Sequence, residues 1–241
     1  MPNPTAAMLV IGDEILSGRT RDANMHFLAG ALTEKGIDLK EVRVVSDDAG
    51  AITSAVRALS AAFDIVVTSG GIGPTHDDIT ADCIAAAFDT PIDVREDARA
   101  RLAAHYAETG TELNAARLRM ARIPDGARLI DNPVSAAPGF VLGNVYVMAG
   151  VPAIFQAMVA SVLPGLTGGA PLVSRSWRIV RGEGDIAGPL ADLAARHPAL
   201  SFGSYPFHQQ DGVHGANIVI RGTDPGAVEA ALDELAGLFP A

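Results

Sequence analysis

The sequence predicts an α/β protein, a three-layer fold with a mainly parallel sheet, followed by a small α+β domain. Through the first two thirds of the chain, short apolar runs that suit buried strands alternate with the apolar spacing of amphipathic helices. This alternation is typical of parallel strands joined by right-handed helical crossovers. Residues 164–171 are almost all turn-forming. We therefore place the domain boundary there, with one domain at residues 1–168 and a second at residues 169–241.

Strands and helices alternate on either side of a glycine-rich stretch. An apolar, often β-branched run marks each strand. Apolar residues spaced i, i+3, i+4 and i+7, as from Met25 to Leu32, mark each helix. We expect Thr80, just after the glycines, to be the N-cap of the following helix. The strands are predicted at residues 6–11, 39–45 and 64–68, and the helices at residues 22–35, around residues 52–59, and from residue 80 to 88.

The remaining elements are two helices, a hairpin and the α+β tail. Gly110 separates the two helices, and Gly143-Asn144 suits a two-residue hairpin turn. The helices are predicted at residues 95–108 and 112–122, the hairpin strands at residues 140–142 and 145–148, and a further helix from residue 153. In the tail, strands are predicted at residues 174–180, 200–205 and 217–221, and helices at residues 186–196 and 226–238.

The centre of the chain is a strand, a glycine loop and a helix. Gly70, Gly71 and Gly73 let the main chain approach an anion where a Cβ would intrude, and the helix N-terminus adds partial positive charge. Asp77 and Asp78 follow directly. Carboxylates beside a phosphate repel it, which indicates a bridging cation or a proton-transfer role. The plain alternative is a tight turn with a polar helix cap, and the glycine spacing fits neither a Walker loop nor a dinucleotide fingerprint.

Three polar clusters follow strands of the predicted parallel sheet, at residues 12–14, 46–48 and 70–78. Because parallel strands end at the same edge, we expect these clusters to converge where open α/β sheets bind ligands. Among the arginines of the two later helices, one is a candidate for a phosphate contact and most are expected to be solvated. These arginines are Arg95, Arg99, Arg101, Arg117, Arg119 and Arg122.

The composition excludes several classes of protein. A formal net charge of −10 without a basic stripe argues against a nucleic-acid partner. The single cysteine, Cys83, cannot form a disulfide within the chain and is expected in the core. Residues 1–11 lack the features of a signal peptide, and no apolar run reaches the ~20 residues of a membrane helix, so we expect a cytoplasmic protein without a membrane partner. His76 is the histidine best placed for acid–base chemistry, whereas His208 and His214 make an unconvincing metal pair.

The string from Thr68 to Thr80 resembles the Thr-x-Gly-Gly-x-Gly-Pro-Thr-x-Asp-Asp-x-Thr motif of the MoaB/Mog molybdopterin-binding family. In particular, it is similar to the branch at the amino terminus of the competence/damage-inducible protein CinA, which is also fused to some FAD synthases. Residues 12–18 resemble the Gly-(Asp/Asn)-Glu-Ile-Leu-x-Gly signature of that branch, and residues 131–140 contain a segment similar to its Asn-x-x-Gly-Ser-Ala-Pro-Gly. Residues 204–206 resemble a Ser-Tyr-Pro turn of the CinA middle domain.

Four positions depart from the family pattern. In residues 131–140, Ser135 and Ala136 stand where the pattern usually has Gly and Ser. After the hairpin the family usually has Pro-Gly-Val-Pro and then, two residues later, Glu. This chain has Ala149 for the first proline and Ile154 for the glutamate. The backbone N–H donors of Gly150 and Val151 survive this change, but an acidic group is lost. The loss weakens the case for this loop in metal binding or catalysis.

The resemblance implies metal-dependent hydrolysis of a pyrophosphate bond in a nucleotide-type ligand such as ADP-ribose or FAD, in a homo-oligomeric protein. The alternative is a molybdopterin or pterin-nucleotide binding module without turnover. A purely structural competence or stress-response partner would leave the polar clusters unexplained. The sequence ends before a counterpart of the carboxy-terminal deamidase domain of CinA, so nicotinamide-nucleotide deamidation is not expected.

The resemblance also implies roles for individual residues. The glycines of the loop, with Thr75, would hold phosphate oxygens. Asp78 and Asp47 would carry Mg²⁺ or a similar divalent ion, and Asp77 or Glu14 would complete its shell or accept a proton. The candidates are Asp78, Asp47 and Asp77 as catalytic residues; Asp78, Asp47 and Glu14 as metal ligands; and Gly12, Glu14, Gly70, Gly71, Gly73, Pro74, Thr75, Pro138, Gly139, Gly150 and Val151 as ligand-binding residues.

Overall fold

The computed structural model describes residues 2–209 and 212–240. The chain divides into two compact units, the first ending at Gly169 and the second beginning at Ala170. The predicted fold class is confirmed: a three-layer α/β unit with a mainly parallel sheet is followed by a small α+β unit. Among the described residues, no helix is both long enough and apolar enough to cross a membrane.

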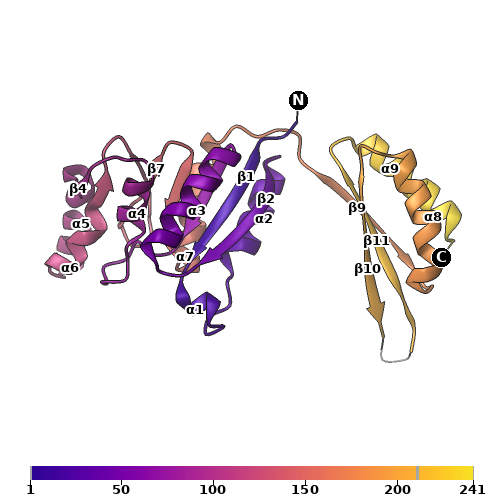
Figure 1. Cartoon of the computed structure of the whole chain (residues 1–241), viewed down its shortest axis with the longest axis horizontal. Coiled ribbons are helices and arrows are strands. Elements are labelled where there is room, and N and C mark those ends of the chain that lie inside the picture. The colour runs from indigo at the N-terminus through magenta and orange to yellow at the C-terminus, as the bar shows by residue number, and fades with distance from the viewer. Residues whose placement is uncertain (1, 210–211, 241) are drawn as a thin grey trace. The chain divides into compact units, whose positions relative to one another are not determined.

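The first unit is built on a six-stranded sheet with the order β2-β1-β3-β8-β7-β6 (Figure 1). The strands β2, β1, β3 and β8 run parallel, and β7 and β6 complete one edge in antiparallel pairing. The strand bounds are Thr5–Ile11 for β1, Asp38–Val45 for β2, Ile65–Ser69 for β3, Arg128–Ile130 for β6, Gly139–Leu142 for β7 and Val145–Met148 for β8.

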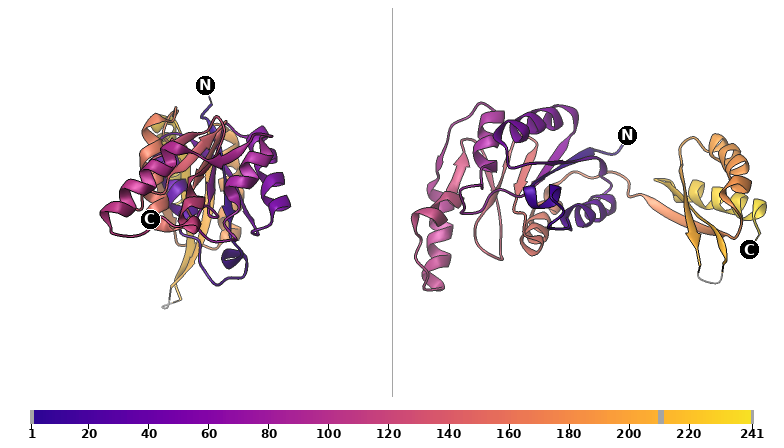
Figure 2. Two further views of the ribbon diagram at one scale, coloured as in Figure 1. Left: turned by 90° about the vertical axis from the view of Figure 1, so that its left-hand side faces the viewer. Right: turned by 60° about the horizontal axis from the view of Figure 1, so that its bottom comes forward.

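Helices cover both faces of this sheet (Figures 1 and 2). Helices α2 (Asn24–Glu34) and α7 (Pro152–Val162) contact each other over one face, and α3 (Ala49–Ala62) and α4 (Thr80–Ala87) contact each other over the other. Alternate residues of β1 are buried in the two cores, which explains why this strand is continuously apolar. Cys83, on α4, lies in the core as predicted.

The segment between α4 and the hairpin differs most from the sequence prediction. Helix α5 (Glu96–Glu108) forms as expected, but the helix predicted over residues 112–122 is only one turn, α6 (Ala115–Leu118). Asn114 caps this turn by accepting a hydrogen bond from the Arg117 N–H at 3.0 Å. The turn is followed by a 3₁₀ segment, η1 (Arg119–Ala121), and by β5 (Arg122–Pro124), which pairs with β4 (Ile92–Val94). The structure also has a four-residue helix, α1 (Asp13–Leu16), where a loop was predicted.

The second unit is an antiparallel sheet of order β10-β11-β9 with two helices on one face (Figure 2). Its core includes Ile186 and Leu193 from the first helix, Val228 and Leu235 from the second, and Ile218 of the central strand. The predicted strands and helices of the tail are confirmed, but residues 204–206, which were likened to a turn, lie inside a strand and pair with the neighbouring strand. The bounds are Val173–Ile179 for β9, Glu183–Arg196 for α8, Ser201–His208 for β10, His214–Gly222 for β11 and Pro225–Leu238 for α9.

Candidate functional site

The strand order creates a crevice at the carboxyl ends of β1 and β3. The chain leaves β1 to add β2 on one side and later adds β3 on the other, with the connecting helices α2 and α3 on opposite faces. A doubly wound sheet binds its ligands at such a reversal of strand order. Gly12 follows β1 directly and Gly70 follows β3 directly, so the glycine loop lies at this switch point.

The predicted convergence of the polar clusters is observed. The Asp13 N–H, after β1, donates to Asp47 Oδ2, after β2, at 2.9 Å. A pocket of about 520 Å³ opens at this place, a volume typical of small-molecule sites. The predicted site residues that line it are Gly12, Glu14, Asp47, Gly70, Gly71, Gly73, Pro74, Asp77, Asp78, Gly150 and Val151.

Three predicted ligand-binding residues do not line this pocket. Thr75 lies outside it and bonds Asp78. Pro138 lines a smaller cavity of about 20 Å³ that adjoins the pocket along the glycine loop. Gly139 is a buried residue of β7, where a Cβ would overlap the Val147 carbonyl oxygen. Close packing against Val147 therefore explains why residue 139 is a glycine.

The glycines of the loop are also needed for packing. Gly70 and Gly71 have φ angles of +110° and +68°, in a region that side-chain-bearing residues rarely adopt. A Cβ on Gly70 would overlap the Ile11 carbonyl oxygen, and a Cβ on Gly71 would overlap Thr80 Oγ1. From the sequence alone, these glycines are expected to let a phosphate approach the main chain. The structure shows that the protein's own atoms already occupy the Cβ positions.

Thr80 is not the N-cap of α4. Ile79 occupies that position, and Thr80 is the first residue of the helix. The buried Thr80 hydroxyl donates to the Gly70 carbonyl at 3.0 Å, and the Thr80 N–H donates to the Gly71 carbonyl at 3.0 Å. The residue therefore binds the glycine loop to the start of α4.

Four carboxylates line the pocket, those of Glu14, Asp47, Asp77 and Asp78. Asp78 is half-buried, and its Oδ2 accepts hydrogen bonds from the Thr75 N–H at 2.8 Å and the Thr75 hydroxyl at 2.5 Å. Burial raises the pKa of Asp47, and the negative charges of Asp13, Glu14 and Asp77 raise it further, against the opposing effect of the Asp13 N–H bond. The pocket wall therefore concentrates negative charge.

Asp77 and His76 lie at the exposed side of the loop. The nearby Thr75 side chain, the backbone N–H of Asp77 and the charge of His76 favour the carboxylate form, so the pKa of Asp77 lies below its ordinary value. Nδ1 of His76 is 3.8 Å from Asp77 Oδ1, and its side chain is 98% exposed. His76 does not line the pocket, so the structure gives no support to the acid–base role considered for it.

The predicted metal ligands share the pocket without forming a closed cage. Glu14, Asp47 and Asp78 all line it. Within residues 2–209 and 212–240, however, no group of three or more His, Cys, Asp or Glu side chains is arranged to hold a metal ion. Asp48, the other acid of the second cluster, caps α3 by accepting from the Ala51 N–H at 2.8 Å.

Asn24 is a structural residue of the site that the sequence analysis missed. It is the first residue of α2 and is 3% exposed. Its Nδ2 donates to Ser69 Oγ at 2.7 Å and to the Gly150 carbonyl at 2.8 Å. The side chain thus joins α2, the end of β3 and the loop before α7. An asparagine in the first turn of an amphipathic helix resembles a cap, which is why the pattern did not single it out.

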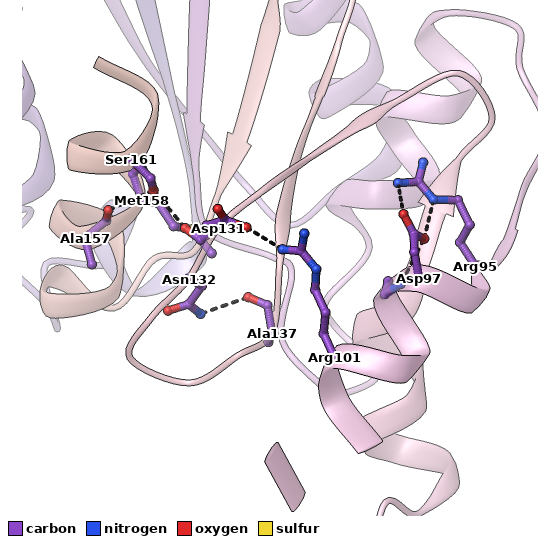
Figure 3. A network of polar contacts seen from close by, with 10 residues as sticks. Arg95, Asp97, Arg101, Asp131, Asn132, Ala137, Ala157, Met158 and Ser161 are labelled. Carbon is purple, nitrogen blue, oxygen red and sulfur yellow. Dashed lines mark hydrogen bonds and ion pairs between the residues drawn. The ribbon is translucent and has the colours of Figure 1, made fainter. Parts of the chain in front are cut away.

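A second missed residue shapes the loop between β6 and β7. Asn132 Nδ2 donates to the Ala137 carbonyl at 2.8 Å (Figure 3). Its Oδ1 accepts from the N–H groups of Val134 and Ser135, at 3.0 and 3.2 Å. Asn132, Ser135 and Ala137 all line the pocket, so this asparagine fixes the loop that closes one side of it.

Comparisons with known proteins agree with this architecture. Residues 7–168 match the family described as "probable molybdopterin binding domain", and residues 171–241 match the family "FAD synthase, middle domain". A protein of Pyrobaculum calidifontis is 33% identical over 251 residues, which cover 98% of this chain and 96% of that protein.

Two further relatives connect the chain to CinA. A CinA-like protein of Citrifermentans bemidjiense is 40% identical over 167 residues, and the match covers 67% of this chain but only 40% of that longer protein. The crystal structure of a CinA of unknown function from Thermoplasma acidophilum superposes with a TM-score of 0.62 at 36% identity, over 67% of this chain and 97% of that one. The chain belongs to the molybdopterin-binding domain family of the MoaB/Mog type, within its CinA-like branch.

Proposed function

We propose that the pocket at the ends of β1 and β3 binds a nucleotide-type ligand and that the protein hydrolyses its pyrophosphate bond with the help of a divalent cation. The observation that carries the proposal is the pocket itself: about 520 Å³ at the switch point of the sheet, with four carboxylates among its lining residues. The match to a molybdopterin-binding family and to a domain of FAD synthase supports a ligand of this class.

The chemistry of the lining residues changes along the row of strands, which supports one orientation of the ligand. Glu14 and Asp47 follow β1 and β2, Asp77 and Asp78 belong to the loop after β3, and the uncharged segment from Ala149 to Ile154 follows β8, at the other end of this row. An apolar heterocycle is best accommodated on the uncharged side. The phosphates would then lie towards the glycine loop and the acids. Ile154, which replaces the acid usual in the family, extends the apolar side.

The donor set fits a cation that binds together with the ligand. Carboxylate oxygens are suitable ligands for Mg²⁺, which is commonly held by one or two carboxylates and by substrate phosphates. Asp47 and Asp78 each use Oδ2 in the hydrogen bonds described above, so Oδ1 of each is the oxygen to offer a cation. When bound, such an ion would polarise the phosphoryl group and lower the pKa of a coordinated water. Without a cation, the four carboxylates would oppose the approach of a pyrophosphate.

The chain's own residues would position the ligand. Thr75 holds the Asp78 carboxylate by two hydrogen bonds, which restricts its rotation at the pocket edge. Asn24 fixes the Gly150 segment against the end of β3, which keeps the uncharged side of the pocket at a defined distance from the glycine loop. Like an ordinary aspartate, Asp77 is ionised at neutral pH, and its lowered pKa makes it a weaker proton acceptor.

The experiment is incubation of the purified protein with ADP-ribose or FAD, with Mg²⁺ or with a chelator, and quantification of AMP by chromatography. Release of AMP that requires Mg²⁺ and fails in Asp78→Asn supports the proposal. The second candidate is a binding module without turnover, favoured by the family match over residues 7–168. Calorimetric binding of a pterin or nucleotide with no product formed would establish that candidate instead.

A further inference from the structure

We propose that Arg119 binds the phosphate groups of the ligand in the pocket at the ends of β1 and β3. The inference rests on the proposed binding of a nucleotide-type ligand. It assigns a cationic partner, from the small adjoining cavity, to the anionic part of that ligand, because the charged residues that line the pocket itself are acidic.

Arg119 lies beside the glycine loop although it comes from a distant segment. It begins η1, 41 residues after Asp78, and its Nη2 donates to the Asp78 carbonyl at 3.3 Å. Together with Gly71 and Gly73 it lines the small cavity that adjoins the pocket. The next residue, Met120, lines both cavities. The guanidinium is therefore held at the loop that carries the candidate anion site.

The other arginines of this region are engaged elsewhere. Arg117 donates to the Glu112 carbonyl at 2.6 Å and lies 5.3 Å from the centre of the Tyr106 ring. Four arginines pair with carboxylates, and Figure 3 shows two of these pairs. The pairs are Arg95–Asp97, Arg99–Glu96, Arg101–Asp131 and Arg122–Asp82.

Arg119 alone among these six has neither an ion pair nor a ring contact within the described part of the chain. A guanidinium has five N–H donors, and one long hydrogen bond to a carbonyl leaves donors for a phosphate. Among the described residues that line the two adjoining cavities, Arg119 and Arg122 are the basic ones, and Arg122 is paired with Asp82. Arg119 is thus the available cation.

The negative charge of the pocket explains why the ligand needs a cationic side chain such as that of Arg119. Four carboxylates line the pocket, and the formal net charge of the chain is −10, so a pyrophosphate enters against a repulsive field. An arginine can bind phosphate oxygens in a bidentate manner, and its charge is permanent. Arg119 would bind at the exposed side of the glycine loop, and a cation at Asp47 and Asp78 would neutralise the acidic side.

The test is calorimetric titration of ADP-ribose, with Mg²⁺ present, into the wild type, Arg119→Ala, Arg119→Lys and Arg117→Ala. We expect Arg119→Ala to weaken binding at least tenfold and Arg119→Lys to weaken it less. Arg117→Ala, two residues earlier and directed to Tyr106, should bind as the wild type does. Repeating the titrations across salt concentrations should show a smaller salt dependence of the dissociation constant for Arg119→Ala, because a screened charge contact has been removed.

Either of two results would overturn the inference. One is equal affinity of Arg119→Ala and the wild type. The other is a loss of affinity in Arg119→Ala with an unchanged salt dependence, since that pattern indicates a loop disturbed structurally. If the wild type itself binds no ADP-ribose, no other nucleotide and no pterin, the proposed function fails, and the inference fails with it. Binding by the wild type with no effect at Arg119 refutes the inference alone.

Discussion

Replacing Gly71 by alanine should destabilise the fold rather than act only on a ligand. The new Cβ would overlap Thr80 Oγ1, and the φ of +68° is unfavourable for alanine. The left-handed backbone costs about 1–2 kcal/mol. Displacing the Thr80 hydroxyl from the Gly70 carbonyl, a buried hydrogen bond, costs about 1–3 kcal/mol. The sum of about 2–5 kcal/mol corresponds to a fall in Tm of roughly 4–20 °C for a unit of this size.

Thermal unfolding followed by circular dichroism measures this effect, and Gly110→Ala is the matched control. Gly110 has a similar φ of +64°, with nothing within 4 Å of the added Cβ, so it carries the backbone strain without the overlap. We expect Gly71→Ala to lower Tm clearly more than Gly110→Ala does. Equal shifts in the two variants would refute the packing argument. In that case, the approach of a phosphate, as expected from the sequence, would explain the glycine at position 71.

Three further predictions concern the site and the two units. Asp78→Asn should reduce Mg²⁺-dependent release of AMP by roughly a hundredfold, the effect of removing about 3 kcal/mol of transition-state stabilisation, and Asp77→Asn should reduce it less; near-wild-type rates in both would remove the catalytic assignment. Asp47 has a raised pKa in the folded state, so folding favours its protonated form and its contribution to stability falls as pH rises through the window above 3.8. Urea titrations should therefore show Asp47→Asn gaining stability relative to the wild type from pH 3 to pH 7, and a pH-independent difference would contradict the raised pKa. Residues 1–168 expressed alone should fold and retain ligand affinity, because every residue of the pocket precedes Pro164; a folded fragment that binds nothing would show that the second unit is required.

The parallel sheet was predictable because burial leaves a periodic signal. Strands β1 and β3 are covered by helices on both faces, so β1 is apolar from residue 6 to 11 and β3 from residue 65 to 67. The helices α2 and α3 each bury one face and show the i, i+3, i+4 spacing. Strands β4, β5 and β6 have three residues each, too few to show a period. The helix predicted over residues 112–122 therefore ends early, because β5 begins at Arg122 and pairs with β4 in a separate two-stranded sheet.

The roles of Asn24 and Arg119 could not be predicted from the sequence because they depend on contacts between segments far apart in the chain. Asn24 is 45 residues from Ser69 and 126 from Gly150, and Arg119 is 41 residues from Asp78. A local sequence pattern contains no information about contacts between residues so far apart in the chain. Thr80 was expected to cap its own helix, but its hydroxyl bonds the Gly70 carbonyl instead. The sequence could propose the polar clusters as neighbours only because parallel strands share an edge.

The packing of the glycine loop bears on how its motif should be interpreted. Gly70, Gly71 and Thr80 are required for the loop to lie on Ile11 and on the start of α4. A domain that only binds a ligand and a domain that hydrolyses it would need this loop equally. The motif is therefore strong support for the fold and weak support for either activity. Residues that contribute little to packing can distinguish binding alone from hydrolysis. In this chain they are the half-buried Glu14, the exposed Asp77 and the exposed Arg119. Substituting these residues should alter ligand chemistry while leaving Tm nearly unchanged, so they separate binding from turnover more cleanly than any change to the glycines.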